Sequence, residues 1–402
     1  MAAITGAALD GLKVVDLSRV LAGPLCTQML ADHGAEVIKV EPPAGDETRH
    51  LGPPFDGAGR SAYYAALNRG KRAISLDLAQ PPAQAVLHRL LQNADVLVEN
   101  FVPGTMERWG LGYAQCLATR YPRLVYCAIS GFGNDGPLGG LPGYDAVLQA
   151  QCGIMSVNGS PETGATRLGL PLVDHLTGYV AFSAILLALQ ARQRTQQGQR
   201  VEAVLFDTAI SLLLPHASNY LSSGHSPGLL GSAHPNIAPY DKFRACDGDL
   251  FLGIVNDGQF RRFCQHLQRQ DLLTDQRFAS NALRLQHRTA LTTEIQHSIT
   301  PHPRTPLCDA LMRCGVPAAP VYSVAEALQQ PHTQHRQLVL REGSYRGLRS
   351  PMQLHSTPGK SGSMPPTFAQ DCDPVLAALG LTEAQRQQLY EVGAAPRANA
   401  TH

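Results

Sequence analysis

The sequence has little tryptophan, no excess of one charge and no closely spaced cysteine pairs. One Trp, 12 Tyr and 11 Phe occur among 402 residues, so we expect an aliphatic core. Lys plus Arg total 33 and Asp plus Glu total 32, which gives a net charge of +1 with His neutral. Such a balance offers no attraction to nucleic acid or to an anionic membrane surface, and we expect neither as a partner. Hydrophobic residues make up 44% of the chain, as is typical of a globular protein.

Nine cysteines are spread along the chain without a C-x-x-C pair. This spacing argues against a zinc knuckle or a thioredoxin-like site, and we expect no metal. Scattered thiols are typical of a reducing compartment, so we expect a cytoplasmic protein. The N-terminus lacks a basic segment before an apolar stretch, and no apolar run reaches the ~18 residues of a spanning helix. The longest run, around residues 179–189, predicts a buried helix.

Strand and helix patterns alternate over the first 200 residues. Strands are predicted at residues 13–17, 35–40, 73–78, 95–98, 124–129 and 201–205, and helices from Pro24, at 83–92 and at 175–193. Repeated strand–helix–strand units build a parallel sheet, which indicates an α/β fold with a Rossmann-like large domain. Ligands of such sheets bind beyond the carboxyl ends of the strands. The loops to consider are therefore 18–23, 41–46, 77–80, 99–104 and 130–143.

The composition changes after the last of these strands, which predicts a division into four parts. Residues 1–205 form the large domain, and residues 206–239, rich in His, Pro, Ser and Gly, form a linker. Residues 240–322 form a smaller α/β domain, and residues 323–402 return to the large domain. Within this last part we expect an extended stretch at 345–366, a helix at 383–392 and disorder at 393–402.

One glycine motif resembles a dinucleotide fingerprint but lacks its context. Residues 131–136 match G-x-G-x-x-G and follow a predicted strand. A dinucleotide site requires that the motif open a helix. Pro137, Gly139, Gly140, Pro142 and Gly143 follow instead, and no helix can begin among them. The chain also lacks H-E-x-x-H and G-x-S-x-G motifs, which argues against a zinc protease and an α/β-hydrolase.

Asp174 stands at the start of a strongly apolar helix pattern. One interpretation is a helix N-cap, which contributes about 1 kcal/mol. The other is a carboxylate nucleophile, kept ionised by the helix N-terminus, that attacks a thioester because thiolate is a good leaving group. His175 cannot face Asp174, since adjacent helix side chains diverge, and is interpreted as a bystander. The triplet at residues 70–72, Gly-Lys-Arg, is either a phosphate contact or a solvated basic turn.

Several short segments, taken in order, resemble the class III CoA-transferase family (CaiB/BaiF type), which includes formyl-CoA transferase and α-methylacyl-CoA racemase. The resemblance runs from about residue 9 to residue 389. Its segments are LDGLKVVDL at 9–17, LAGP at 21–24, GAEVIKVE at 34–41, NRGKR at 68–72, DVLVENF at 95–101, GYD at 143–145 and GVPAAPV at 315–321.

The resemblance implies a ping-pong CoA transfer with Asp174 as the nucleophile. It implies an acyl-aspartyl anhydride, then an aspartyl-CoA thioester, with CoA and acyl-CoA as substrates and no separate cofactor. It also implies an interlocked homodimer. Gly224, Gly228 and Gly231 lie where relatives have a mobile glycine-rich loop, although this chain has Leu229-Leu230-Gly231-Ser232 there.

The resemblance further marks a CoA groove in the loops that follow the strands. Arg108 is its expected phosphate partner, and Pro42-Pro43 replace an arginine that relatives carry after the second strand. The implied CoA-binding residues are Leu21, Ala22, Leu76, Asp77, Leu78, Ala79, Asn100, Phe101, Val102, Arg108, Tyr144 and Asp145.

Two questions about the reaction stay open at this point. Racemases of the family place a His at the position of Tyr144, and a phenol with a pKa near 10 is a poor base, which disfavours α-carbon epimerisation. Residues 234–240, HPNIAPY, resemble relatives that act on itaconate, mesaconate or citramalate with succinyl-CoA as the donor. Arg167, His225 and His234 are candidate partners for a second carboxylate, or else structural residues.

Overall fold

The computed structural model describes residues 6–57, 59–360 and 364–396, and the chain divides into two compact units. Unit 1 contains the chain up to Cys152, Gly169–Leu212 and the chain from His332. Unit 2 contains Gly153–Leu168 and Leu213–Pro331. The segment 153–168 thus groups with unit 2, whereas the sequence pattern placed it in the large domain.

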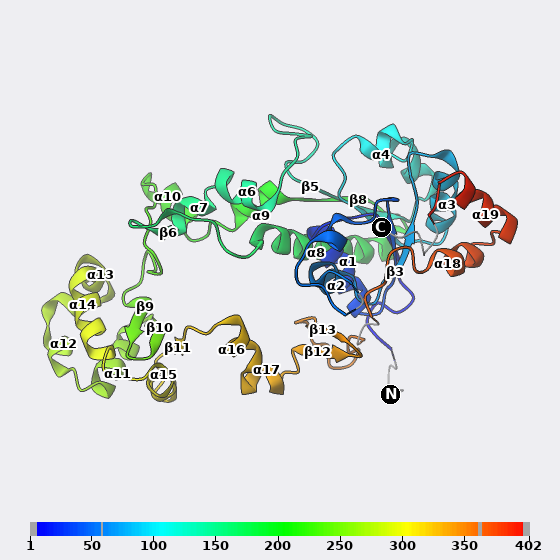
Figure 1. Ribbon diagram of the computed structural model, residues 1–402. Helices are drawn as coiled ribbons and strands as arrows, with labels where there is room; N and C mark the ends of the chain where they lie inside the picture. The colour runs from blue at the N-terminus through cyan, green and yellow to red at the C-terminus, as the bar shows by residue number, and fades with distance from the viewer. Residues whose placement is uncertain (1–5, 58, 361–363, 397–402) are drawn as a thin grey trace. The chain divides into compact units, whose positions relative to one another are not determined.

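Unit 1 is built on a six-stranded parallel sheet, which confirms the predicted α/β fold (Figure 1). The strands are β1 (Lys13–Asp16), β2 (Glu36–Glu41), β3 (Arg72–Ser75), β4 (Val96–Glu99), β5 (Val125–Ser130) and β8 (Arg200–Val204). Their order is β3-β2-β1-β4-β5-β8, and Val14 of β1 pairs with both Val37 and Val96. The strand order reverses between β1 and β4, the point where such sheets place their ligands.

One face of the sheet is covered by α1 (Ala22–Asp32) and α8 (Leu172–Thr195), which pack on each other. A Cβ on Gly178 of α8 would lie 2.8 Å from the carbonyl oxygen of Ala22, so this glycine permits the close approach. α8 is long and apolar enough to cross a membrane by length and composition alone, contrary to the expectation that no such segment exists. One such helix is weak evidence for a membrane span, because the core helices of soluble proteins can have the same length and apolar composition.

One apolar core of unit 1 joins segments from the beginning and from the end of the chain. Helices α3 (Pro81–Leu91), α18 (Cys372–Ala378) and α19 (Glu383–Glu391) bury leucines and valines in one cluster with side chains of the sheet. Figure 1 shows the red C-terminal helices beside α3. Ala394 and Ala395 are fully buried, so the disorder predicted from residue 393 is wrong for these two, while residues 397–402 lie outside the described part.

The remaining elements of unit 1 are short. They are the 3-10 helix η1 (Glu47–His50), α2 (Ala62–Asn68), α4 (Thr105–Arg108), η2 (Tyr113–Leu117), α5 (Ala118–Arg120), α6 (Asp145–Gln151), α9 (Leu205–Ser211), α17 (Pro331–His335, mostly in this unit) and the hairpin β12 (Val339–Glu342) and β13 (Tyr345–Leu348). No helix begins between Gly131 and Tyr144, as the glycine- and proline-rich sequence predicts.

Unit 2 has an antiparallel sheet in the order β11-β10-β9, packed against helices around its own apolar core. The strands of unit 2 are β9 (Tyr240–Ala245), β10 (Gly248–Gly253) and β11 (Ala318–Pro320) in this sheet, and β6 (Gly159–Ser160) and β7 (Gly164–Ala165) in a separate pair. Its helices are α7 (Ile154–Val157), α10 (His216–Ser223), α11 (Asp257–His266), α12 (Gln270–Thr274), η3 (Gln276–Phe278), α13 (Asn281–Gln286), α14 (Arg288–Ile299), α15 (Arg304–Arg313) and α16 (Val324–Gln329). The predicted linker 206–239 therefore includes most of α9 and all of α10.

Candidate active site

A cavity of about 180 Å³ lies in unit 1 beyond the carboxyl ends of the central strands. The loops after β1, β4 and β5 supply most of its wall, as the parallel-sheet argument predicts. Asp174 of α8 lines the same cavity. The cavity is lined by Arg19, Val20, Leu21, Ala22, Glu47, Asn100, Phe101, Val102, Pro103, Ile129, Ser130, Gly131, Leu141, Pro142, Gly143, Tyr144, Asp174 and Leu205.

Asp174 is in the first turn of α8 and is not its N-cap. The helix begins at Leu172 after Pro171, which makes no side-chain cap. The cap comes from another helix, because Oδ2 of Asp145 accepts the backbone N–H groups of Val173 at 2.7 Å and of Asp174 at 3.1 Å. The N-cap interpretation of Asp174 is therefore wrong, and its carboxylate is left to line the cavity.

The pKa of Asp174 is raised from 3.8 to about 7 by burial and by the neighbouring charge of Asp145. The expectation that the helix N-terminus keeps Asp174 ionised is wrong, because the pKa of Asp174 is raised rather than lowered. Asp145 already occupies the first N–H groups of α8, so they favour Asp145 rather than Asp174. A carboxyl group poised near pH 7 with little hydration is a strong candidate for chemistry. Burial and the same two carboxylates raise the pKa of Tyr63 to about 12, so this phenol also lies near the pair.

The loop after β1 is held rigidly at the cavity wall. The side chain of Asn100 accepts the backbone N–H of Arg19 at 2.8 Å and donates to the carbonyl of Arg19 at 2.7 Å. Val20 has a φ of 68°, which is rare for a β-branched residue and persists only where the surroundings enforce it. The Arg19 guanidinium bonds Glu47 at 2.8 Å and lies 5.7 Å from the ring centre of Phe101.

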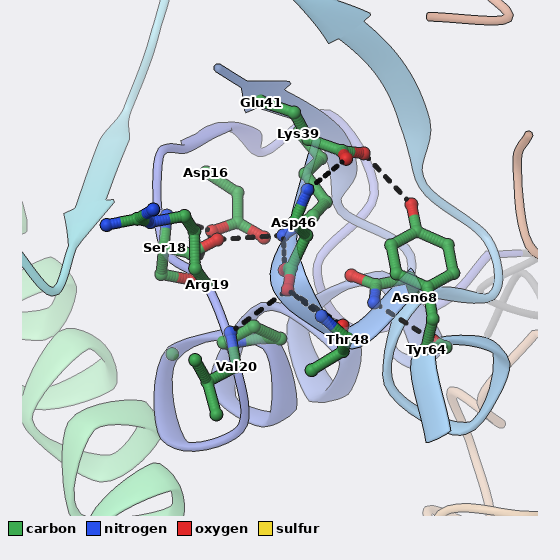
Figure 2. Close-up of polar contacts among 12 residues, drawn as sticks. Asp16, Ser18, Arg19, Val20, Lys39, Glu41, Asp46, Thr48, Tyr64 and Asn68 are labelled. Carbon is green, nitrogen blue, oxygen red and sulfur yellow. Dashed lines mark hydrogen bonds and ion pairs between the residues drawn. The ribbon is translucent and has the colours of Figure 1, made fainter. Parts of the chain in front are cut away.

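Buried charges beneath this loop fix its position (Figure 2). Lys39 and Asp46, whose side chains are fully buried, form an ion pair at 2.9 Å. Nζ of Lys39 also donates to the carbonyl of Ser18 at 2.7 Å, and Oδ1 of Asp46 accepts the N–H of Val20 at 3.4 Å and of Thr48 at 3.0 Å. One pair thus anchors the loop at two backbone groups.

A second buried pair continues the network. Nζ of Lys71 lies 3.1 Å from Oδ2 of Asp16, and both side chains are fully buried. Burial alone would raise the pKa of Asp16, but Lys71 and Lys39 outweigh it and hold the pKa at about 2. Lys71 is thus neither a phosphate contact nor part of a solvated turn. The two interpretations of residues 70–72 both fail for this residue.

The structure brings together six of the predicted CoA-binding residues and the predicted nucleophile. Asp145 sits behind the cavity wall and positions α8. The residues at the cavity are Leu21, Ala22, Asn100, Phe101, Val102, Tyr144 and Asp174.

Five predicted residues lie away from this cavity. Leu76 and Leu78 belong to the apolar core, and the N–H of Asp77 donates to the carbonyl of Ala394 at 2.9 Å. Arg108 is exposed and donates to the hydroxyl of Thr105 at 2.7 Å. The five are Leu76, Asp77, Leu78, Ala79 and Arg108.

Sequence reasoning missed three features of the site. The first is Arg19, the one cation among the residues that line the cavity. The sequence indicates its loop, residues 18–23, but not Arg19 as a site residue. Gly131 and Gly143 form the second feature, because a Cβ on Gly131 would lie 2.7 Å from the backbone nitrogen of Gly143. This close approach explains the first glycine of the motif that mimics a dinucleotide fingerprint. The third is the acidic pair itself, which no sequence spacing indicates.

Comparisons with known proteins identify the family of this chain. The model of the family "CoA-transferase family III" matches residues 9–372. A succinate–glutarate CoA-transferase of Agrobacterium fabrum is 40% identical over 386 residues, covering 93% of this chain and 96% of that protein. A succinyl-CoA:mesaconate CoA-transferase of Haloarcula hispanica is 37% identical, with 83% and 85% covered. The crystal structure of a CaiB/BaiF family protein from Brucella suis has a TM-score of 0.85 and 40% identity, with 93% and 100% covered. This chain belongs to CoA-transferase family III.

Proposed function

We propose that this enzyme moves CoA from succinyl-CoA to a small dicarboxylic acid, with Asp174 as the nucleophile. The observation that carries the proposal is a half-buried carboxyl group with a pKa of about 7 at the wall of a cavity beyond the sheet. The glutarate and mesaconate transferases named above support the substrate class. Glutarate thereby joins itaconate, mesaconate and citramalate among the acceptors to test.

The proposed reaction has four steps. An oxygen of the Asp174 carboxylate attacks the thioester carbon of succinyl-CoA, and the C–S bond breaks to give a mixed anhydride and CoA thiolate. The thiolate attacks the Asp174 carbonyl carbon, which releases succinate and leaves an aspartyl-CoA thioester. The acceptor carboxylate attacks that thioester, again expelling thiolate. Attack of the thiolate on the acceptor carbonyl forms the new CoA ester and returns the Asp174 carboxylate.

Several contacts support this course. The burial that raises the pKa of Asp174 also limits the access of water, which would hydrolyse both intermediates. Val102, Leu141 and Tyr144 line the cavity, are 53%, 50% and 69% exposed, and offer apolar contact to a CoA chain. We propose Leu21, Ala22, Asn100, Phe101, Val102 and Tyr144 as CoA contacts.

Arg19 is the proposed partner of the substrate's second carboxylate. It lines the cavity, and its guanidinium is one-third exposed. Its present partner, Glu47, is more than half exposed, so a substrate carboxylate can replace it at little cost. Asn100 fixes the backbone of Arg19 and so limits where the guanidinium can reach.

A cytoplasmic homodimer is the proposed state of the enzyme. α8 carries exposed apolar side chains, Leu187 at 73% and Val180 at 38%, which a second copy of the chain would cover. Analytical ultracentrifugation measures the state, and a monomer at micromolar concentration contradicts it.

Purified enzyme incubated with succinyl-CoA and each candidate acid tests the proposal, with CoA esters identified by mass spectrometry. Asp174→Ala must yield none, while Asp309→Asn, which changes an exposed carboxylate of α15, must retain activity. Formation of glutaryl-, itaconyl-, mesaconyl- or citramalyl-CoA identifies the acceptor. Epimerisation of a branched acyl-CoA without exchange contradicts the transferase and supports the racemase reaction.

A further inference from the structure

A second cavity, of about 490 Å³, lies elsewhere in unit 1. None of the residues that line it lines the cavity at Asp174. Its walls come from the end of α1, from Arg69 and from the C-terminal segment between His335 and Lys360. The backbone N–H of Lys360 bonds the carbonyl of Asp32 at 2.8 Å, and the Ser350 hydroxyl lies 3.3 Å from Nε2 of His33, so the segment is tied to α1 and the residue after it.

The wall of this second cavity is strongly positive. Arg69, Arg336, Arg349 and Lys360 line it, with Asp32 as the one carboxylate among the lining residues. Asp32 is paired with Arg69, and Lys360 reaches Asp10 in a surface pair at 2.5 Å. The side chains of Arg336 and Arg349 form no hydrogen bond or ion pair with residues 6–57, 59–360 or 364–396.

Arg69 adds a buried donor that is not satisfied. The residue is 4% exposed, and its Nη2 bonds Asp32. Its Nε has no hydrogen-bond partner among the described residues. Because this nitrogen has almost no accessible surface, Arg69 gives the wall its charge, while the free donors come from Arg336 and Arg349.

We propose that this cavity binds a small molecule carrying two phosphate groups or a diphosphate. Guanidinium forks match phosphate oxygens in paired hydrogen bonds. Arg69 and Lys360 have carboxylate partners, but Arg336 and Arg349 have none in the described part of the chain. A single carboxylate would neutralise only one of these two, whereas each phosphate ester brings about −1.5 to −2 charges. The volume lies within the range of about 300–1,000 Å³ that is usual for small-molecule pockets. The site is separate from the transfer reaction and does not depend on its identity.

Isothermal titration of the full-length enzyme with inorganic pyrophosphate, and separately with citrate, tests this site. We expect one pyrophosphate site that saturating CoA does not displace. Arg336→Gln and Arg349→Gln should each weaken it about tenfold or more, since a charged hydrogen bond contributes about 1.5–3 kcal/mol. Arg341→Gln is the matched control, because Arg341 is exposed on β12 next to the cavity but does not line it.

Five results would overturn the assignment. Displacement of pyrophosphate by CoA would place it in the transfer site. Equal losses in Arg341→Gln and Arg349→Gln would reduce the effect to general surface charge. Absence of pyrophosphate binding would remove the phosphate site. Tighter binding of citrate than of pyrophosphate would assign the wall to carboxylates. A loss of self-association in the arginine variants, without binding of either anion, would assign the wall to carboxylates of a second copy of the chain.

Discussion

The backbone N–H of Asp174 donates to Oδ2 of Asp145 at 3.1 Å, so one carboxylate holds the helical turn that presents the other. The contact places two acidic side chains next to each other and gives them different roles. Asp145 takes the hydrogen bonds, from Val173, Asp174 and Gln149, that stabilise an anion. Asp174 is left with burial and a negative neighbour, and its pKa rises to about 7.

Replacing Asp145 with Asn should move the pH profile of CoA transfer. The nucleophile acts ionised, so kcat/KM with saturating second substrate rises as pH passes through the pKa of Asp174 in the free enzyme. Removing the Asp145 charge lowers that pKa, and the acidic limb shifts to lower pH. An unchanged limb with reduced kcat would mean that Asp145 acts only as a helix cap.

Asp174→Asn should abolish transfer and stabilise the protein at pH 8. The folded state holds the Asp174 proton up to about pH 7, the unfolded state only to about 3.8, so stability from this group falls as pH rises between these values. Above pH 7 the wild-type protein must carry the Asp174 carboxylate in this poorly hydrated position, whereas the Asn side chain of the variant is uncharged. We expect Tm to rise by about 2 °C or more at pH 8 and hardly at pH 4. Calorimetry at both pH values measures the difference, and an equal change at both would refute it.

Arg19→Gln should raise the KM for the dicarboxylic acceptor while leaving kcat within a few-fold. The loss of one charged hydrogen bond predicts about a tenfold effect or more. A monocarboxylic acid of the same chain length provides the internal control, because it lacks the group that Arg19 would bind. Equal losses for both acids would assign Arg19 to the CoA moiety instead.

Lys39→Met should destabilise unit 1 by about 3–5 kcal/mol, because it leaves Asp46 buried without its cation. The carbonyl of Ser18 also loses its donor, so the KM for CoA esters should rise as the loop at the cavity loosens. Urea unfolding measures the loss. The double variant Lys39→Met/Asp46→Leu should lose less than the sum of the single variants. Simple additivity would mean that the pair does not couple.

Gly178→Ala should destabilise the packing of α1 on α8 by about 1–3 kcal/mol despite the better helix propensity of alanine. The added Cβ would lie 2.8 Å from the carbonyl oxygen of Ala22 at the start of α1. Gly169→Ala, also in unit 1, is the control, since a Cβ there would meet no atom within 4 Å. Thermal unfolding of both variants decides whether the approach of the two helices requires glycine.

The sheet was predictable because its strands are short apolar runs separated by helix patterns. All six predicted strands of unit 1 overlap the observed ones, with differences of a few residues at their ends. The start of α8 was not predictable, because its cap comes from Asp145, 29 residues earlier in the chain. Likewise, Lys39 and Lys71 look like surface residues in the sequence, and only the fold shows that buried carboxylates neutralise them. For the five predicted CoA-binding residues outside the cavity, contact with bound CoA stays a prediction.

The core of unit 1 contains Val15 and Leu97 from the first hundred residues and Leu376 and Leu389 from near the other end. During synthesis the ribosome therefore completes Leu213–Pro331 of unit 2 before the last part of the unit 1 core exists. At about 5–20 residues per second, roughly 10–30 seconds pass between the synthesis of β8 and that of α18, which packs on one face of the sheet. A prematurely terminated chain that ends before α18 would keep α3 but leave the rest of that apolar face exposed to chaperones and proteases.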